Sequence, residues 1–153
     1  MFVYRITKKE YIALDGRGGL YGPGRWHKKG NFVIYTSEHA SLAAWEKIVH
    51  VAGFENLPRD LFLVKIEIPD RIEILSVPQK ILVAEWDSFP FAKETIEFGT
   101  SFLRNKEYLA LKVPTVIIPD EYNIILNPLH PEILQCKIIS EIPFKFDKRV
   151  SKI

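Results

Sequence analysis

Three side chains in the first third of the chain have types suited to an anionic, sugar-bearing ligand. Arg25 lies in a glycine-rich stretch, Tyr35 closes an apolar run, and Glu46 lies within an apolar, helix-like segment. A guanidinium makes planar, bidentate contacts to phosphate, and glycines let a backbone approach phosphate closely. A carboxylate can stabilise an oxocarbenium-like centre or orient a nucleophile. Together these residue types suit the cleavage of a glycosidic bond.

Each of these side chains also has an ordinary structural explanation. Arg25 stands next to Trp26, and an exposed Arg often stacks on a neighbouring aromatic ring. Tyr35 fits a core tyrosine whose hydroxyl has found a partner. A carboxylate is costly to bury without a partner, so Glu46 fits a helix face turned to water. Local sequence leaves both explanations open for all three residues.

The histidines do not form a metal-binding pattern. Glu46 and His50 are four residues apart on one helix face, but two ligands without an HExxH motif are too few for a zinc site. His27, His39 and His130 show no ligand spacing either. We therefore expect no metal site.

Composition is typical of a single globular domain, which we expect to span 1–153. Apolar residues make up 47% and charged residues 26% of the 153 positions, which is ordinary for a folded protein. A net charge of +2 is too small to indicate a nucleic-acid partner. The single Cys136 excludes an internal disulfide and fits a reducing cytosol. No signal peptide and no run of about 20 apolar residues is visible, so we expect a cytoplasmic protein that does not contact a membrane.

The hydrophobic pattern predicts many short strands and two helices. Strands are expected over 2–6, 31–36, 61–68, 71–75, 109–113, 116–118, 124–126 and 135–142, and helices over 37–51 and 91–103. The stretch 15–30 holds six of the eight glycines and is predicted as a functional loop. Strands and helices do not alternate regularly, which favours an α+β domain of short mixed or antiparallel strands over a doubly wound parallel sheet.

In their order and spacing, these segments resemble the RES-domain family, toxins of bacterial toxin–antitoxin pairs. The matching residues are Tyr4-Arg5-Ile6, Asp15-Gly16, Gly18-Gly19, Gly24-Arg25-Trp26, Gly30, Val33 to Ser37, Leu42-Ala43, Glu46, His50, Leu111 to Thr115, Pro119, Glu121, Asn123 and Asn127 to Pro131. The family is named for an Arg, a Glu and a Ser. The Arg corresponds to Arg5 or Arg25, the Glu to Glu46, and the Ser position holds Thr115, which keeps the hydroxyl but stiffens χ1.

The resemblance implies a fold similar to that of ADP-ribosyltransferases, in which two small sheets pinch a cleft. It implies no bound cofactor and NAD+ as substrate, cleaved at the nicotinamide–ribose bond by phosphate or water, or used to transfer ADP-ribose to a protein. The expected catalytic residues are Glu46, Arg25 and Thr115. The expected substrate-binding residues are Arg5, Gly16, Gly19, Gly24, Trp26, Tyr35, Ser37 and Asn123. In this scheme Arg5 and Arg25 hold the pyrophosphate, and Tyr35 stacks on nicotinamide.

The resemblance also implies a partner, a cognate antitoxin with a helix-turn-helix region, bound in an oligomeric complex without direct contact of this chain to nucleic acid. Thr115 at the Ser position leaves an alternative open, a catalytically silent module of the same fold that binds a nucleotide or a partner. Release of nicotinamide from NAD+ distinguishes the enzyme from the silent module.

Overall fold

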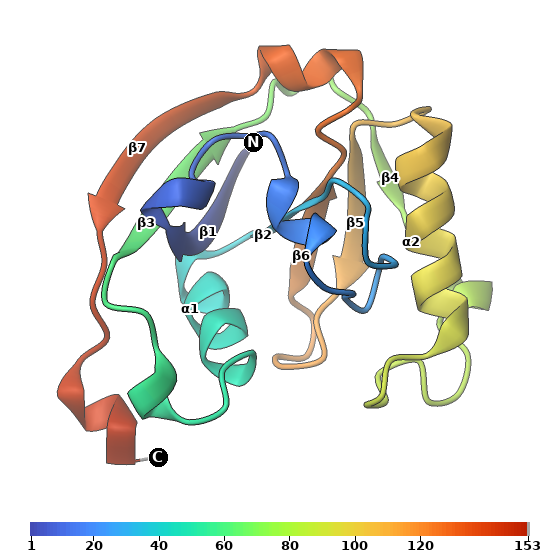
Figure 1. Ribbon diagram of the computed structural model, residues 1–153. Coiled ribbons are helices and arrows are strands. Elements are labelled where there is room, and N and C mark those ends of the chain that lie inside the picture. Colours follow the sequence, from blue (N-terminus) through green and yellow to red (C-terminus); the bar gives the residue numbers. More distant parts are fainter. Residues whose placement is uncertain (153) are drawn as a thin grey trace.

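A computed structural model describes residues 1–152, and its central feature is a seven-stranded sheet in the order β4-β5-β6-β2-β1-β3-β7 (Figure 1). The strands are β1 (Phe2–Lys8), β2 (Ile34–Ser37), β3 (Leu61–Glu67), β4 (Ile74–Ser76), β5 (Ala110–Pro114), β6 (Tyr122–Leu126) and β7 (Lys137–Pro143). The helices are α1 (Ala40–Val49) and α2 (Lys93–Asn105). β4 and β5 run parallel, and the other neighbouring strands run antiparallel. The predicted α+β class with a mixed sheet is confirmed.

The two halves of the sheet meet at one pair of residues. Across the described residues, β1 pairs with β2 at Tyr4 and Ser37 alone, whereas β1 pairs with β3 along its whole length. The sheet therefore opens at the β1–β2 joint, and both residues of the joint line a cleft. The expected pair of small sheets is in fact one sheet whose halves are joined at this point.

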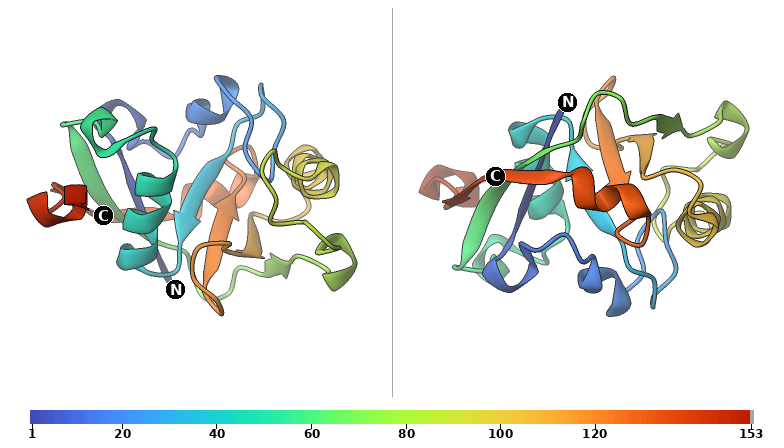
Figure 2. Two further views of the ribbon diagram at one scale, coloured as in Figure 1. Left: turned by 90° about the horizontal axis from the view of Figure 1, so that it is seen from below. Right: turned by 90° about the horizontal axis from the view of Figure 1, so that it is seen from above.

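Alternation along the strands separates two parts of the core. Ile124 and Leu126 of β6 pack with Val3 of β1 in one cluster, while Ile125 packs with Phe102 of α2 in another. Successive strand side chains point to opposite faces, so the face that carries Ile125 is the one that α2 covers. α1 packs at the other half of the sheet, where Ala43, Ile6 and Leu61 form a third cluster. The two helices thus lie apart along the sheet (Figure 2).

Several predicted boundaries differ from the structure. The helix expected over 37–51 begins at Ala40, because Ser37 still belongs to β2 and pairs with Asn123. The strand expected over 116–118 is wrong, since these residues form the turn between β5 and β6. An apolar run of three residues does not distinguish a strand from an apolar turn. The last strand begins at Lys137. Within 1–152, no helix has the length and apolar character that a bilayer crossing requires.

Candidate active site

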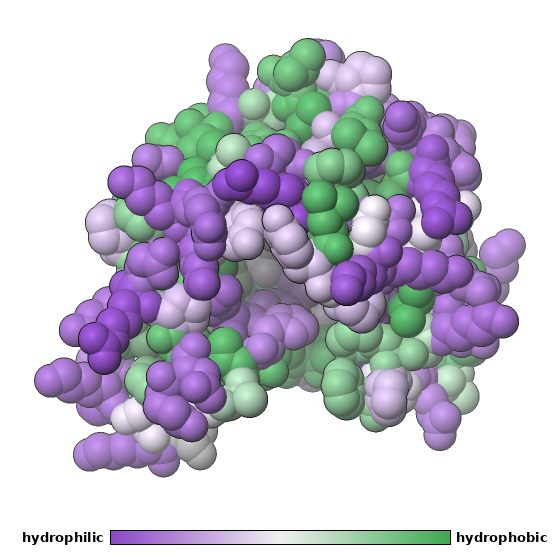
Figure 3. Space-filling view, in the orientation of Figure 1, coloured by the Kyte–Doolittle hydropathy of each residue, from purple (hydrophilic) through white to green (hydrophobic). Residues whose placement is uncertain are grey.

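A cleft of about 730 Å³ lies where the sheet opens. The predicted site residues that line it are Arg5, Gly19, Gly24, Arg25, Trp26, Tyr35, Ser37, Glu46, Thr115 and Asn123. They come from β1, the loop that follows it, β2, α1, the end of β5 and β6. Figure 3 shows a hollow in the centre of this face with hydrophilic side chains around it. The structure thus brings together residues that lie more than a hundred positions apart in the sequence.

Gly16 is the predicted site residue that does not line the cleft. It is buried with φ of +68°, and its carbonyl accepts hydrogen bonds from the N–H groups of Gly19 and Val33. A Cβ at this position would come within 2.5 Å of Pro128 Cγ. Gly16 therefore fixes the backbone at the start of the glycine-rich loop, where Pro128 leaves no room for a side chain.

The Glu46 carboxylate is held by the ends of two neighbouring strands. The Thr115 hydroxyl donates to Glu46 Oε1 at 2.9 Å, and the Asn123 amide Nδ2 donates to the same oxygen at 2.5 Å. The second oxygen, Oε2, faces His50 Nε2 at 3.5 Å. The Glu46 side chain keeps 22% of its surface exposed, so it is fixed at one oxygen and reachable from the cleft.

These contacts keep Glu46 ionised. Burial raises the pKa of Glu46, but hydrogen bonds from His50, Asn123 and Thr115, together with the charge of His50, outweigh burial and lower the pKa below its ordinary value. Hydrogen bonds donated to a carboxylate favour its charged form. The explanation in which Glu46 faces water therefore does not hold, and the site contains a fixed negative charge at neutral pH.

A second layer of hydrogen bonds orients the groups that hold Glu46. The Ser37 hydroxyl donates to Asn123 Oδ1 at 2.7 Å, which turns the amide nitrogen of Asn123 toward Glu46. The Ile117 N–H donates to Thr115 Oγ1 at 3.1 Å, which leaves the hydroxyl proton of Thr115 for Glu46. Ser37 and Asn123 are therefore placed to position the carboxylate.

Arg25 contacts the segment 86–91, in which no site residue was predicted. Its Nη1 donates to the carbonyl oxygens of Trp86 and Ser88 at 2.8 and 3.0 Å, and its guanidinium carbon lies 5.1 Å from the centre of the Phe91 ring. Burial lowers the pKa of Arg25, against the raising effect of Asp87, Glu46 and Tyr35. The stacking expected with the adjacent Trp26 is thus made with Phe91 and, at 5.9 Å, with Trp86. The density of aromatic residues in 86–91 is the signal in the sequence that could have pointed to this segment.

Arg5 and Lys47 form a cationic region of the cleft. Arg5 Nη2 makes a long hydrogen bond of 3.4 Å to Thr7 Oγ1, and among the described residues no carboxylate lies within 4 Å of its guanidinium. Burial lowers the pKa of Arg5 to about 10, against the opposing charge of Asp15. Burial also lowers the pKa of Lys47, and the charges of Arg5 and Lys8 add to the effect. Cations that repel one another favour a bound anion.

Tyr35 fastens the glycine-rich loop to β2. Its hydroxyl accepts from the Trp26 N–H at 3.2 Å and lies 2.8 Å from His27 Nδ1. His27 Nε2 lies 2.9 Å from the Gly22 carbonyl, so the network assigns the neutral tautomer in which Nε2 donates to Gly22 and Nδ1 accepts from Tyr35. Burial lowers the pKa of His27 and raises that of Tyr35. A Cβ on Gly24 would lie 2.7 Å from the Tyr35 hydroxyl. Tyr35 therefore has a satisfied hydroxyl and a ring at the cleft.

The remaining predicted residues have clear positions. Trp26 is 3% exposed, and its ring lies 6.4 Å from that of Trp86, so most of it is core. Gly19 is buried in the loop wall. His27 and Lys47 are cleft residues that the site prediction lacked. Within 1–152, no three His, Cys, Asp or Glu side chains gather in a way that could hold a metal ion.

The fold and the cleft define an α+β protein in which a fixed carboxylate and two arginines line one cleft beside the β1–β2 joint. The RES domain matches residues 2–147, and the chain belongs to the RES domain family. A protein named Toxin Res from Yersinia enterocolitica is 35% identical over 98% of this chain and 99% of its own length. A protein named Prs ADP-ribosylating toxin from Sphingobium sp. is 31% identical over 90% of this chain and 86% of its own.

A solved structure shares the fold at low identity. A chain from the crystal structure of the M. tuberculosis MbcT–MbcA toxin–antitoxin complex superimposes with a TM-score of 0.73 at 16% identity, covering 94% of this chain and 84% of that one. At this identity the likeness concerns the arrangement of strands and helices.

Proposed function

We propose that this protein is the toxin of a toxin–antitoxin pair and that it consumes NAD+ by breaking the nicotinamide–ribose bond. The observation that carries the proposal is the ionised Glu46, fixed by Thr115 and Asn123 in a cleft that also holds two arginines. The names of the relatives, Toxin Res and Prs ADP-ribosylating toxin, support the toxin role and a substrate that carries ADP-ribose.

In this mechanism Glu46 acts on the sugar. The bond from ribose C1′ to the nicotinamide nitrogen breaks, its electron pair neutralises the nicotinamide ring, and positive charge develops on the ribose. A fixed carboxylate next to that charge stabilises the transition state more than the ground state. Nicotinamide leaves as a neutral molecule, so no general acid is needed. The acceptor oxygen then bonds to C1′, and the proton that it carried passes to solvent.

Arg25 and Arg5 bind the pyrophosphate in this scheme. Both guanidinium groups remain charged at neutral pH, because burial lowers the pKa of Arg5 only to about 10 and the charges of Asp87 and Glu46 oppose the lowering of the pKa of Arg25. Their partners within the chain are carbonyl and hydroxyl oxygens, so their charge is available for phosphate. The ring of Tyr35 stacks on nicotinamide.

The position of Thr115 supports an enzyme over the silent module. Its hydroxyl donates to the carboxylate and is itself oriented by a backbone N–H. A serine at this position would offer the same hydroxyl, so the substitution retains the contact that we assign to the family's Ser.

The acceptor is phosphate, water or a protein, and transfer to a protein is the second candidate because one relative is named an ADP-ribosylating toxin. Incubation of the purified protein with NAD+, with and without phosphate, followed by mass analysis, separates the three. Phosphorolysis yields phosphorylated ADP-ribose, hydrolysis yields ADP-ribose, and transfer increases the mass of a protein. Absence of nicotinamide release under all conditions would overturn the proposal.

We further propose that the protein acts in the cytoplasm and is held in check by a helix-turn-helix antitoxin in an oligomeric complex. An uncontrolled consumer of NAD+ harms its own cell, so expression alone is expected to stop growth and lower cellular NAD+. Co-expression of the antitoxin is expected to restore both and to give a stable complex, and the Glu46→Gln variant is expected to be harmless. Harmless expression of intact wild-type protein with unchanged NAD+ would favour the silent module.

A further inference from the structure

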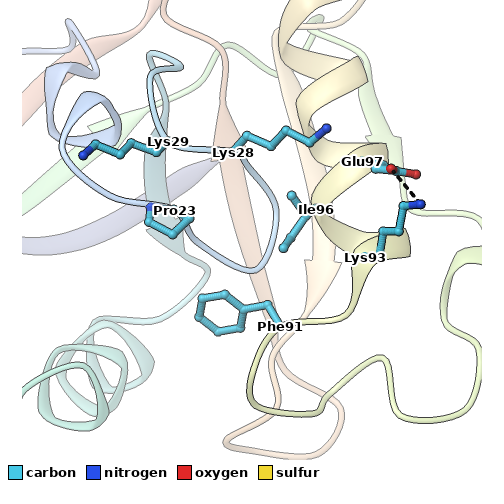
Figure 4. A pocket seen from close by; sticks show the side chains of 7 residues that line it. All are labelled: Pro23, Lys28, Lys29, Phe91, Lys93, Ile96 and Glu97. Atoms are coloured by element: carbon cyan, nitrogen blue, oxygen red, sulfur yellow. Dashed lines mark ion pairs between the residues drawn. The ribbon is translucent and has the colours of Figure 1, made fainter.

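A second pocket adjoins the cleft on the side of α2. Its volume is about 420 Å³, and it shares Pro23 and Phe91 with the cleft. Figure 4 shows Pro23, Phe91 and Ile96 around the pocket, with Lys93 and Glu97 on α2 beside it. The two cavities are therefore neighbours that share these two residues.

The lining of this pocket suits a nucleoside. Phe91, Pro23 and Ile96 offer apolar surface for the face of a flat base, and aromatic rings stack on such faces. Lys28 and the Lys93–Glu97 ion pair, at 3.7 Å, supply charged donors and acceptors around it. The pocket is open to solvent and combines this apolar surface with four charged side chains, Lys28, Lys29, Lys93 and Glu97.

Arg25 lies at the junction of the two cavities. Its guanidinium carbon is 5.1 Å from the ring of Phe91, and Phe91 faces both cavities. A dinucleotide whose pyrophosphate is bound at Arg25 would have one nucleoside in the cleft near Glu46 and the other beyond Phe91. The loop that carries Lys28 is fixed to α2 by a hydrogen bond from the Lys28 N–H to Thr100 Oγ1 at 3.0 Å, so the pocket is preformed.

We propose that this pocket binds the adenosine half of NAD+ and makes the protein selective for the dinucleotide. The inference rests on the proposed function, because it assumes that the nicotinamide half lies at Glu46. Nicotinamide mononucleotide contains the same scissile bond but no adenosine, so the two substrates separate the contribution of this pocket from that of the cleft.

The test uses Ile96→Glu, with Ile96→Val as the matched control. Ile96 lies on α2 and lines the second pocket but not the cleft that holds Glu46, and glutamate is a good helix former. The added carboxylate is expected to raise the KM for NAD+ by about tenfold, equivalent to about 1.4 kcal/mol. Turnover of nicotinamide mononucleotide is expected to be unchanged, which also shows that the variant is folded. The milder Ile96→Gln is expected to raise the KM for NAD+ less than Ile96→Glu does and to leave turnover of nicotinamide mononucleotide unchanged.

Equal losses for the two substrates, or an unchanged KM for NAD+ in Ile96→Glu, would overturn the inference. Calorimetric titration with AMP separates its failure from that of the proposed function. Wild-type protein that binds AMP, with binding lost in Ile96→Glu and kept in Ile96→Val, supports the pocket even if neither substrate is cleaved. Wild-type protein that cleaves NAD+ but does not bind AMP at millimolar concentration would refute the pocket and leave the proposed function intact.

Discussion

The Thr115 hydroxyl donates to Glu46 Oε1 across 2.9 Å, linking the end of β5 to the middle of α1. The two residues are 69 positions apart in the chain, and the contact is made from the half of the sheet that includes β5 and β6 to the helix that packs on β1. Glu46 therefore keeps its position only while the two halves keep theirs. This hydrogen bond links Glu46 and Thr115, the two residues that we assign to the family's Glu and Ser positions.

Replacing Glu46 with Gln should abolish most NAD+ turnover while leaving the fold intact. Glutamine keeps the shape and an oxygen that can accept from Thr115 and Asn123, but it removes the charge that stabilises the ribosyl cation. We expect a loss on the order of 100-fold or more, as for other lost electrostatic contacts to a transition state. Nicotinamide release measures it, and Glu141→Gln on the exposed β7 is the control. Wild-type turnover in Glu46→Gln would refute the mechanism.

Two substitutions at Thr115 separate its hydroxyl from its methyl group. Thr115→Ser should leave turnover equal or higher, because it keeps the donor to Glu46. Thr115→Val keeps the shape but loses the donor, and we expect a loss of about tenfold, or roughly 1.4 kcal/mol. If the Ser variant instead loses more than about tenfold, the methyl group packs usefully and the correspondence to the family's Ser is misjudged.

Arg25→Lys should weaken NAD+ binding although the charge is kept. An ammonium group cannot reproduce the planar fork that a guanidinium presents to phosphate, and it also loses the geometry of the bonds to the carbonyls of Trp86 and Ser88. We expect KM to rise by about tenfold. Arg17→Lys, outside the cleft, is the control. Unchanged KM and kcat would show that Arg25 serves only to hold the loop.

Stability should fall as the pH drops below about 6.5, in part because of His27. Burial lowers the pKa of His27 in the folded state below its ordinary 6.5, so between these two pKa values the unfolded chain binds a proton that the folded chain does not. The stabilisation that the neutral His27 contributes is therefore fully present above pH 6.5, and it is lost as the pH falls through the pKa of His27 in the folded state. Melting curves across pH should show a shallower decline for His27→Gln than for wild type. The exposed His39→Gln should follow the wild-type slope, and equal slopes for all three would contradict this assignment.

Sequence reasoning reached the fold class and the family because these depend on patterns that are local or ordered along the chain. The strand pattern of 61–68 and the helix around Glu46 follow from hydrophobic spacing alone. The fold class and the RES family membership are confirmed. The site residues were predicted from the resemblance to the family. All of them except Gly16 line the cleft in the structure.

What sequence reasoning missed depends on contacts between distant segments. No local feature of Arg25 indicates that its partners are backbone carbonyls 61 and 63 positions away. The sequence showed only that His27 lacks the spacing of a metal ligand, because its partners, Tyr35 and the Gly22 carbonyl, carry no sequence signal for a network. The apolar run Val116 to Ile118 was predicted as a strand, yet it forms the turn that brings Asn123 back toward Glu46.

The strongest effect on stability outside the site should come from Gly99→Ala in α2. A Cβ there would lie 1.9 Å from the Trp26 carbonyl oxygen, a rigid backbone atom, so α2 and the arginine-bearing loop would have to separate. Overpacking of this kind costs about 1 to 3 kcal/mol, which for a protein of this size lowers Tm by roughly 2 to 12 °C. Gly18→Ala is the matched control, because its Cβ meets no atom within 4 Å. The difference in Tm between the two variants is measured by thermal unfolding. A Gly99→Ala protein as stable as Gly18→Ala would mean that α2 does not pack closely against the Trp26 backbone.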